Sequence, residues 1–222
     1  MKAALRNPAF WGWLALACLP PDLLAWALGW DGLQPGAILV SLAWWPLDVL
    51  GRLAALRLLL RAEGNPLAEA SPGPAPGLAA AWASAGSAEL RVGLWSTVWA
   101  LLGLLPAFLI LSLGALAHPL GRGLLILAGL LGLAPALLYV LRRWVAVFFV
   151  LQGRGASGAL EASRARMEGK MGPFLWAFLP WMLAAWAVEG VSWALPGAWG
   201  LPLEPVGMAL ELLALWRGAQ AL

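Results

Sequence analysis

The sequence predicts an all-α fold, a polytopic bundle of transmembrane helices with about six spans. Of its 222 residues, 62% are hydrophobic and only 11% are charged, whereas a soluble domain carries about 25% charged residues. The mean hydropathy is +0.82. Most of the surface therefore faces a solvent that does not reward charge, and the hydrocarbon of a bilayer is that solvent.

Six apolar stretches have the length of membrane spans or come close to it. At about 1.5 Å of rise per residue, about 20 apolar residues cross the hydrocarbon core. The first stretch is interrupted by Pro20-Pro21, and the second and the last are short or carry charges. The sequence leaves open whether the first and the last cross the membrane fully. β-Barrel strands would need short segments that alternate apolar and polar residues, and the sequence shows no such alternation. The predicted spans are about 9–28, 36–52, 92–116, 123–151, 173–195 and 198–217.

Basic residues indicate on which side of the membrane each loop lies. Lys and Arg are enriched in cytoplasmic loops. If the N-terminus is cytoplasmic, Arg122 is the only one of the fourteen Lys and Arg residues in an outer loop, so we predict that both termini are cytoplasmic. The net charge is +3, and the basic residues that produce it lie mostly between the apolar runs. At those positions they can contact anionic lipid headgroups. We expect membrane lipids as partners, other membrane proteins as a second class, and no nucleic acid.

Two segments predicted to be short cytoplasmic amphipathic helices, 78–91 and 157–170, are similar to each other. Each leads into a Trp-rich apolar stretch. We interpret the similarity as a duplicated unit of span, amphipathic helix and span, which is a parallel repeat because two spans per unit keep the direction of the chain. At a constant offset of 79, the matching residues are Ala83-Ser84 with Ala162-Ser163, Glu89 with Glu168, Arg91 with Lys170, and Gly93 with Gly172.

The sequence offers no complete set of catalytic or metal-binding residues. Ser157, in Gly155-Ala156-Ser157-Gly158, resembles the nucleophile of rhomboid intramembrane proteases, but a serine nucleophile needs a base. The single histidine, His118, precedes Ser157 and falls on the opposite predicted face of the membrane. We therefore predict that Ser157 caps a helix and that the protein is not an enzyme. With one His and one Cys, Cys18, we predict no metal and no cofactor.

Polar residues within or beside the predicted spans form the candidate intramembrane site. A carboxylate at the bilayer centre costs about 3 kcal/mol, so it usually faces protein or water and marks function. Asp48 precedes Arg52 by four residues, and this spacing predicts an ion pair on one helix face. Glu211 lies well inside its apolar run and is expected to face the bundle interior. The candidate residues are Glu211, Glu189, Asp48, Arg52 and Asp22.

The stretch at about 142–174 carries a recognisable pattern. Its landmarks are Arg142-Arg143-Trp144, Gln152-Gly153, Ala159-Leu160-Glu161-Ala162-Ser163-Arg164, Gly169, Gly172 and Phe174. This pattern resembles the membrane domain attached to some glycerophosphoryl diester phosphodiesterases, and the YciC-type inner-membrane proteins. In that group Glu is usual at the position of Gln152, and a basic residue is common at Glu161-Ala162. The resemblance implies a six-span protein of the bacterial cytoplasmic (inner) membrane, and its motifs include no catalytic residue.

The leading hypothesis is a non-enzymatic membrane component that binds lipid or a protein partner. Each basic side chain near the inner leaflet contributes about 1 kcal/mol to such contacts. A transporter with Glu211 in its pathway is the first alternative, and an intramembrane enzyme the second. A water-accessible cavity that reaches Glu211 favours transport, whereas a lateral apolar groove favours lipid or protein binding. The residues expected to contact lipid or a partner are Arg142, Arg143, Arg154, Arg164, Arg166 and Lys170.

Overall fold

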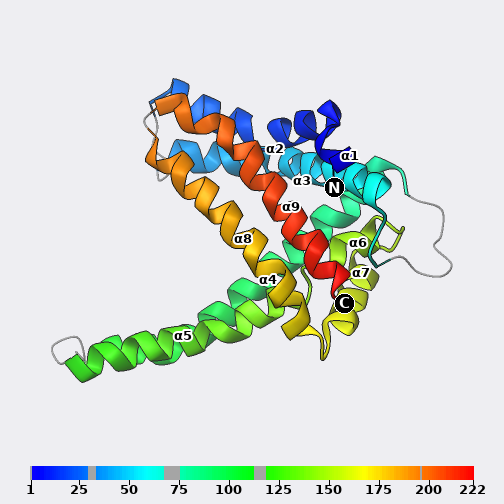
Figure 1. Ribbon diagram of the computed structural model, residues 1–222. Coiled ribbons are helices and arrows are strands. Elements are labelled where there is room, and N and C mark those ends of the chain that lie inside the picture. Colours follow the sequence, from blue (N-terminus) through cyan, green and yellow to red (C-terminus); the bar gives the residue numbers. More distant parts are fainter. Residues whose placement is uncertain (1, 30–33, 68–75, 113–118, 196) are drawn as a thin grey trace.

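The computed structural model is helical across the residues that it describes, which are 2–29, 34–67, 76–112, 119–195 and 197–222 (Figure 1). The predicted all-α class is therefore confirmed. In chain order the elements are α1 (Lys2–Leu5), α2 (Pro8–Ala27), α3 (Pro35–Glu63), α4 (Leu78–Ser112), α5 (Pro119–Leu141), α6 (Ala146–Val150), α7 (Ala156–Met167), α8 (Met171–Ala194), the 3-10 helix η2 (Gly197–Leu203) and α9 (Glu204–Gln220).

Among the described residues, five helical stretches are long and apolar enough to cross a membrane, as expected of a membrane protein. At about 1.5 Å per residue, each reaches or approaches the roughly 30 Å of hydrocarbon. Pro20 and Pro21 do not interrupt the first of them, because α2 continues through both. The stretches are Pro8–Ala27, Pro35–Glu63, Leu78–Ser112, Leu120–Val150 and Met171–Ala194.

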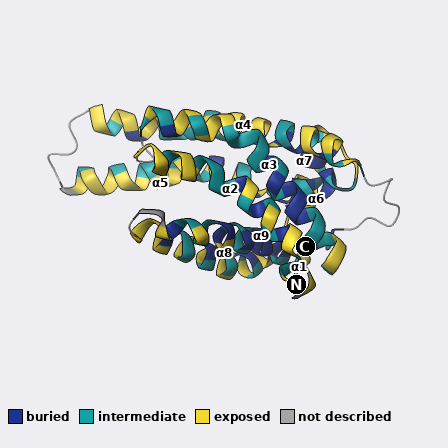
Figure 2. Ribbon diagram, turned by 90° about the horizontal axis from the view of Figure 1, so that it is seen from above, coloured by how far each residue is buried: buried dark blue, intermediate teal, exposed yellow. Residues whose placement is uncertain are grey.

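The predicted sixth span, 198–217, is not one long helix. Its first residues form η2, and α9 has 17 residues, which extend about 25 Å. Most of α9 is buried against α8 and α2, as Figure 2 shows. The apolar side chains that predicted lipid exposure here are instead covered by the chain itself.

The helices form two arms that diverge from a common base (Figure 1). One arm is the α4–α5 hairpin, and the other contains α2, α3, α8 and α9. The base contains α1, α6, α7 and the C-terminus. The large side chains that are fully buried, among them Phe148, Phe174 and Leu56, lie in elements that meet toward the base. The hairpin is mostly exposed along its length (Figure 2).

Two helices end at other residues than the predicted spans on the base side. The predicted span 36–52 continues as helix α3 to Glu63, because Leu53, Leu56 and Leu59 are buried in the core. Conversely, the predicted span 123–151 is not one continuous helix, since α5 ends at Leu141 and a turn over 142–145 precedes the short helix α6, although Leu120–Val150 as a whole is long and apolar enough to cross a membrane. The turn contains Arg142 and Arg143, whose charges disfavour a continued path through hydrocarbon.

The two similar segments differ in one local respect. Residues 78–91 are no separate helix, because α4 continues without a break into the predicted span, whereas α7 ends at Met167 and α8 begins at Met171. Gly169 has φ +71° in that break, a conformation that favours glycine. At the predicted offset of 79, the corresponding residue is Leu90, which continues the helix.

Helix boundaries follow nearly the same spacing as the matching residues. α3 ends at Glu63 and α5 at Leu141, while α4 begins at Leu78 and α7 at Ala156. Both pairs of boundaries are 78 residues apart, close to the offset found in the sequence. This agreement favours the predicted duplication, with α3 and α4 corresponding to α5 and α7–α8.

The hairpin depends on a close backbone contact. A Cβ at Gly132 would lie 2.0 Å from the carbonyl oxygen of Gly103, and a Cβ at Gly103 would lie 1.8 Å from that of Gly132. Small residues allow membrane helices to approach in this way. Gly129, on the same helix, has no neighbour within 4 Å of such a Cβ.

We predict that Gly132→Ala lowers stability by about 1–3 kcal/mol, the usual cost of overpacking, because backbone on both sides must move. Gly129→Ala serves as the matched control and should be neutral or slightly stabilising, since alanine favours helix. Both are measured as the midpoint of unfolding in mixed detergent micelles. Equal effects of the two substitutions would contradict the close contact.

Candidate functional site: a polar cluster and a cavity between the arms

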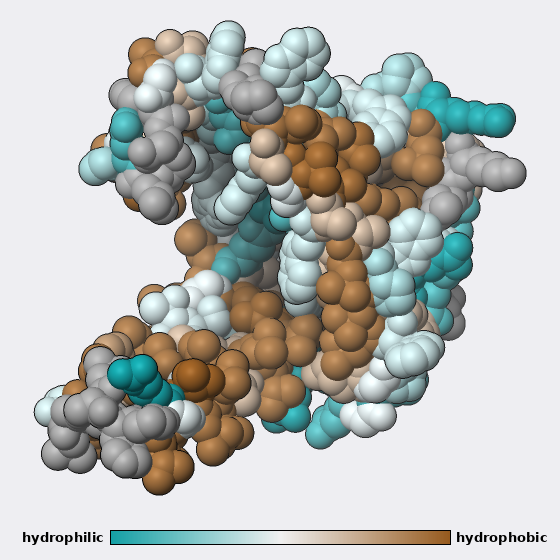
Figure 3. Space-filling view, turned by 60° about the vertical axis from the view of Figure 1, so that its left-hand side comes forward, coloured by the Kyte–Doolittle hydropathy of each residue, from teal (hydrophilic) through white to brown (hydrophobic). Residues whose placement is uncertain are grey.

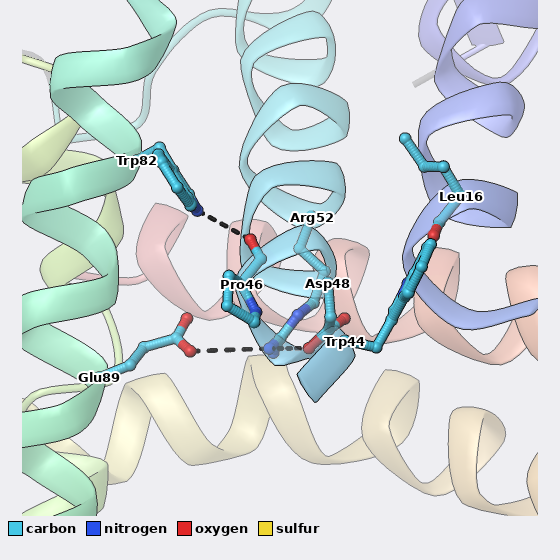
Figure 4. A network of polar contacts seen from close by, with 7 residues as sticks. All are labelled: Leu16, Trp44, Pro46, Asp48, Arg52, Trp82 and Glu89. Carbon is cyan, nitrogen blue, oxygen red and sulfur yellow. Dashed lines mark hydrogen bonds and ion pairs between the residues drawn. The ribbon is translucent and has the colours of Figure 1, made fainter. Parts of the chain in front are cut away.

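A charged cluster joins α3 to α4 (Figure 4). Arg52 Nη2 lies 2.5 Å from Asp48 Oδ2, one turn earlier on α3, and 3.6 Å from Glu89 Oε2 on α4. The Asp48–Arg52 pair expected from the sequence is present. Glu89 was not among the candidate residues, because it falls in the segment predicted to lie outside the membrane. Its position one turn before the predicted span 92–116 was the available signal.

Tryptophan indoles add contacts around this cluster. Trp82 of α4 donates to the carbonyl oxygen of Pro46 at 2.7 Å, and Trp44 of α3 donates to that of Leu16 in α2 at 3.1 Å (Figure 4). The side chain of Trp45 is also hydrogen-bonded to Glu89. An indole N–H in an apolar environment usually needs an acceptor. These bonds therefore connect α2, α3 and α4 near the cluster.

A cavity of about 460 Å³ lies beside the cluster. Its walls come from α3, α4, the end of α5 with the following turn, α6, α7 and α9. Most of the lining is apolar, and the polar lining side chains are Arg52, Glu89, Ser96 and Arg143. Figure 3 shows a hollow between the two arms, with hydrophilic surface deep inside it and apolar surface around it.

The side chain of Arg143 lines this cavity, and contacts with Tyr139 fix the position of its guanidinium group. Its Cζ lies 3.7 Å from the centroid of the Tyr139 ring, and its Nη1 donates to the Tyr139 carbonyl oxygen at 3.3 Å. Within the described part of the chain, no carboxylate forms a salt bridge with it. The other predicted lipid or partner contacts are exposed near the base: Arg142, Arg154, Arg164, Arg166 and Lys170.

Glu189 and Glu211 meet across α8 and α9. The two carboxyl groups lie close enough to interact directly. Gly207, one turn before Glu211, leaves room, because a Cβ there would lie 3.3 Å from Glu189 Cγ. Glu211 therefore faces another helix, but the partner is a second carboxyl group. Asp22 is exposed on α2 and does not join this pair.

The cavity does not extend to the carboxyl pair. Leu212 and Leu215 of α9 line it, whereas Glu211 does not. The observation that would favour transport through Glu211 is thus missing from the described structure. A largely apolar cavity beside a hollow corresponds better to the lateral groove expected of a lipid- or protein-binding membrane component.

The prediction that Ser157 caps a helix is wrong. α7 begins at Ala156, and its N-cap residue is Gly155, which makes no side-chain cap hydrogen bond. Ser157 instead accepts a hydrogen bond of 2.5 Å from Arg91 Nη1 on α4. The helix starts before the serine, so the hydroxyl is free to join α7 to α4. His118 lies outside the described residues.

Whether other titratable side chains could bind a metal ion depends on how closely they are grouped. Over the described ranges, no group of three or more His, Cys, Asp and Glu residues is placed to hold a metal ion. The half-buried Cys18 donates to the carbonyl oxygen of Leu14 in its own helix.

Comparison of the chain with protein-family models, curated proteins and solved structures gives no match. The resemblance at 142–174 therefore stays a prediction. At Gln152, where that group usually has Glu, the side-chain amide donates to the carbonyl oxygen of Leu67 at 2.8 Å. An ionised Glu accepts hydrogen bonds only, so it could not replace this bond.

We predict a double-mutant coupling between Arg52 and Glu89. Arg52→Leu should cost about 2 kcal/mol of stability, because it leaves Asp48 and Glu89 uncompensated in a partly buried site. Glu89→Leu should cost less, and the double variant should recover about 1 kcal/mol relative to additivity. Unfolding midpoints in detergent measure the cycle. Arg57→Leu, one and a half turns later on α3, is the control, and its loss of stability should add to that of Glu89→Leu. If the losses for Arg52→Leu and Glu89→Leu are also additive, the two side chains do not interact.

Proposed function

We propose that the protein is a six-span membrane protein, with both termini in the cytoplasm, that binds a membrane lipid in the cavity between its two arms. The observation that carries this proposal is the cavity itself, which combines apolar walls with a few charged groups beside α3, α4 and the 142–145 turn. Ligand sites commonly have this character and a volume of roughly 300–1,000 Å³.

The arrangement of the helix ends supports the six-span topology. α1, α6, α7 and the C-terminus share the base, while the end of α2, the start of α3, η2 and the hairpin tip lie at the opposite ends of the arms (Figure 1). Most of the basic residues therefore gather at the base, with Arg122 at the far end of the hairpin as the predicted exception, and such a distribution is typical of a cytoplasmic side. Together, η2 and α9 return the chain along α8 to the base.

Lateral access supports lipid as the ligand class. The hairpin exposes apolar side chains such as Leu101, Leu105, Leu130 and Leu137, and a large exposed apolar surface in a membrane protein is covered by lipid. Acyl chains between the arms can extend toward the cavity without crossing water. A polar solute has no comparable reason to enter through this surface.

The non-enzymatic character is part of the proposal. Among the described residues of the cavity wall there is Ser96, whose hydroxyl donates to the carbonyl oxygen of Gly93 at 2.9 Å. A serine nucleophile would need a base in hydrogen-bonding reach, and this hydroxyl is directed to the backbone. The wall groups fit binding better than nucleophilic catalysis.

Cysteine labelling tests the topology. In a Cys18→Ala background, Glu161→Cys on α7 should react with a membrane-impermeant maleimide only when the cytoplasmic face is open. Gln34→Cys, before α3, should react only from the opposite face. These two positions lie at the base and at the far end of an arm. If both react from the same face of sealed vesicles, the six-span arrangement is wrong.

Filling the cavity tests lipid binding. Gly93 lines the cavity, and a Cβ at this position meets no atom within 4 Å, so Gly93→Trp can occupy the space without a backbone clash. We expect it to lower labelling by photoactivatable phospholipids in proteoliposomes several-fold. Gly129→Trp, equally open but outside the cavity, is the matched control. Unchanged labelling of a folded Gly93→Trp variant would refute binding in the cavity.

A further inference from the structure

We propose that the lipid held in this cavity is an anionic phospholipid whose phosphate pairs with Arg143. The inference rests on the proposed function, because it assumes that a lipid occupies the cavity, and it adds the chemistry by which that lipid is selected. The residues concerned lie at the end of α5, in the turn that follows it, and on α3 and α4.

The charges on the cavity wall are not equivalent. Arg52 already has Asp48 at 2.5 Å and Glu89 at 3.6 Å, so two carboxylates neutralise its single charge. Glu89 is further engaged by Trp45. Arg143 has no carboxylate in a salt bridge within the described chain. It is therefore the cation on this wall whose charge remains for a ligand.

The geometry of Arg143 suits a phosphate. Stacking on Tyr139 and the bond to the Tyr139 carbonyl oxygen fix the guanidinium, yet one bond uses only one of its five N–H donors. The remaining fork can bind two oxygens of one phosphate in parallel. Because the side chain is already held, less conformational entropy is lost when the ligand binds.

The surroundings of Arg143 favour an anionic headgroup over a zwitterionic one. The segment 142–170 contains six basic residues against two acidic residues, Glu161 and Glu168. Most of the basic side chains are exposed around the base, where they raise the local concentration of anionic lipid. A zwitterionic headgroup would bring its own cation into this positive region, which offsets the attraction.

The apolar walls separate a phospholipid from free phosphate. Val92, Val140, Val147 and Leu212 line the same cavity as Arg143, and an inorganic ion would leave this surface unused. A lipid places phosphate at Arg143 and buries methylene groups along these walls, each contributing in proportion to its area. The proposal therefore commits to a phospholipid with a net negative headgroup.

The test compares two photoactivatable lipids with identical acyl chains, phosphatidylglycerol and phosphatidylcholine, in proteoliposomes that contain the full chain. We expect the wild-type protein to be labelled several-fold more by phosphatidylglycerol, because both lipids offer a phosphate to Arg143 but only phosphatidylcholine brings a cation that offsets the attraction. Arg143→Gln should bring the ratio near one while labelling by phosphatidylcholine persists. Arg143→Lys, which keeps the charge, should retain part of the preference and controls for folding.

Arg61→Gln provides the matched control, because Arg61 is an exposed basic residue in the last turn of α3 that does not line the cavity. It should leave the ratio unchanged. A similar drop for Arg61→Gln and Arg143→Gln would assign the preference to general surface charge and overturn the inference. Equal labelling by both lipids in the wild type, removed by Gly93→Trp, would overturn the inference but leave lipid binding in place. Labelling insensitive to Gly93→Trp would instead refute the proposed function.

Discussion

Arg52 is the charged group around which the two arms are joined. A guanidinium in an apolar bundle is stable only when opposite charges and acceptors surround it, and here these come from its own helix and from α4. The need to satisfy this charge fixes the height at which α4 crosses α3, and Trp82 adds a second bond at the same crossing. Beyond that point the hairpin diverges from α3 (Figure 1), and the cavity lies beside the crossing.

The sequence predicted best those features that depend on residues close together in the chain. Apolar length predicted the long helices, and the four-residue spacing predicted the Asp48–Arg52 pair. The contacts of Glu89 with Arg52 and of Glu189 with Glu211 join residues on different helices, and no spacing rule encodes such a meeting. Hydropathy likewise cannot tell lipid contact from burial by protein, which is why α9 was predicted as an ordinary span.

The two segments that are similar in sequence, 78–91 and 157–170, differ in their structure at one position. Gly169 allows a sharp turn between α7 and α8, so α7 folds against the core through Leu160, Ser163 and Met167. At the predicted offset, Leu90 occupies the corresponding position and α4 continues as one helix. The packed helix α7 and the extended helix α4 both contribute residues to the cavity wall.

The free length of the hairpin links the protein to the thickness of its bilayer. From Glu89 to Ser112 the helix extends about 35 Å beyond its joint, and its partner α5 moves with it because Gly103 and Gly132 are in backbone contact. A long apolar segment in a thin bilayer tilts to stay within hydrocarbon. Over this length, a small rotation at the joint would displace the tip by several ångströms. Local membrane thickness would in this way set how widely the arms stand apart.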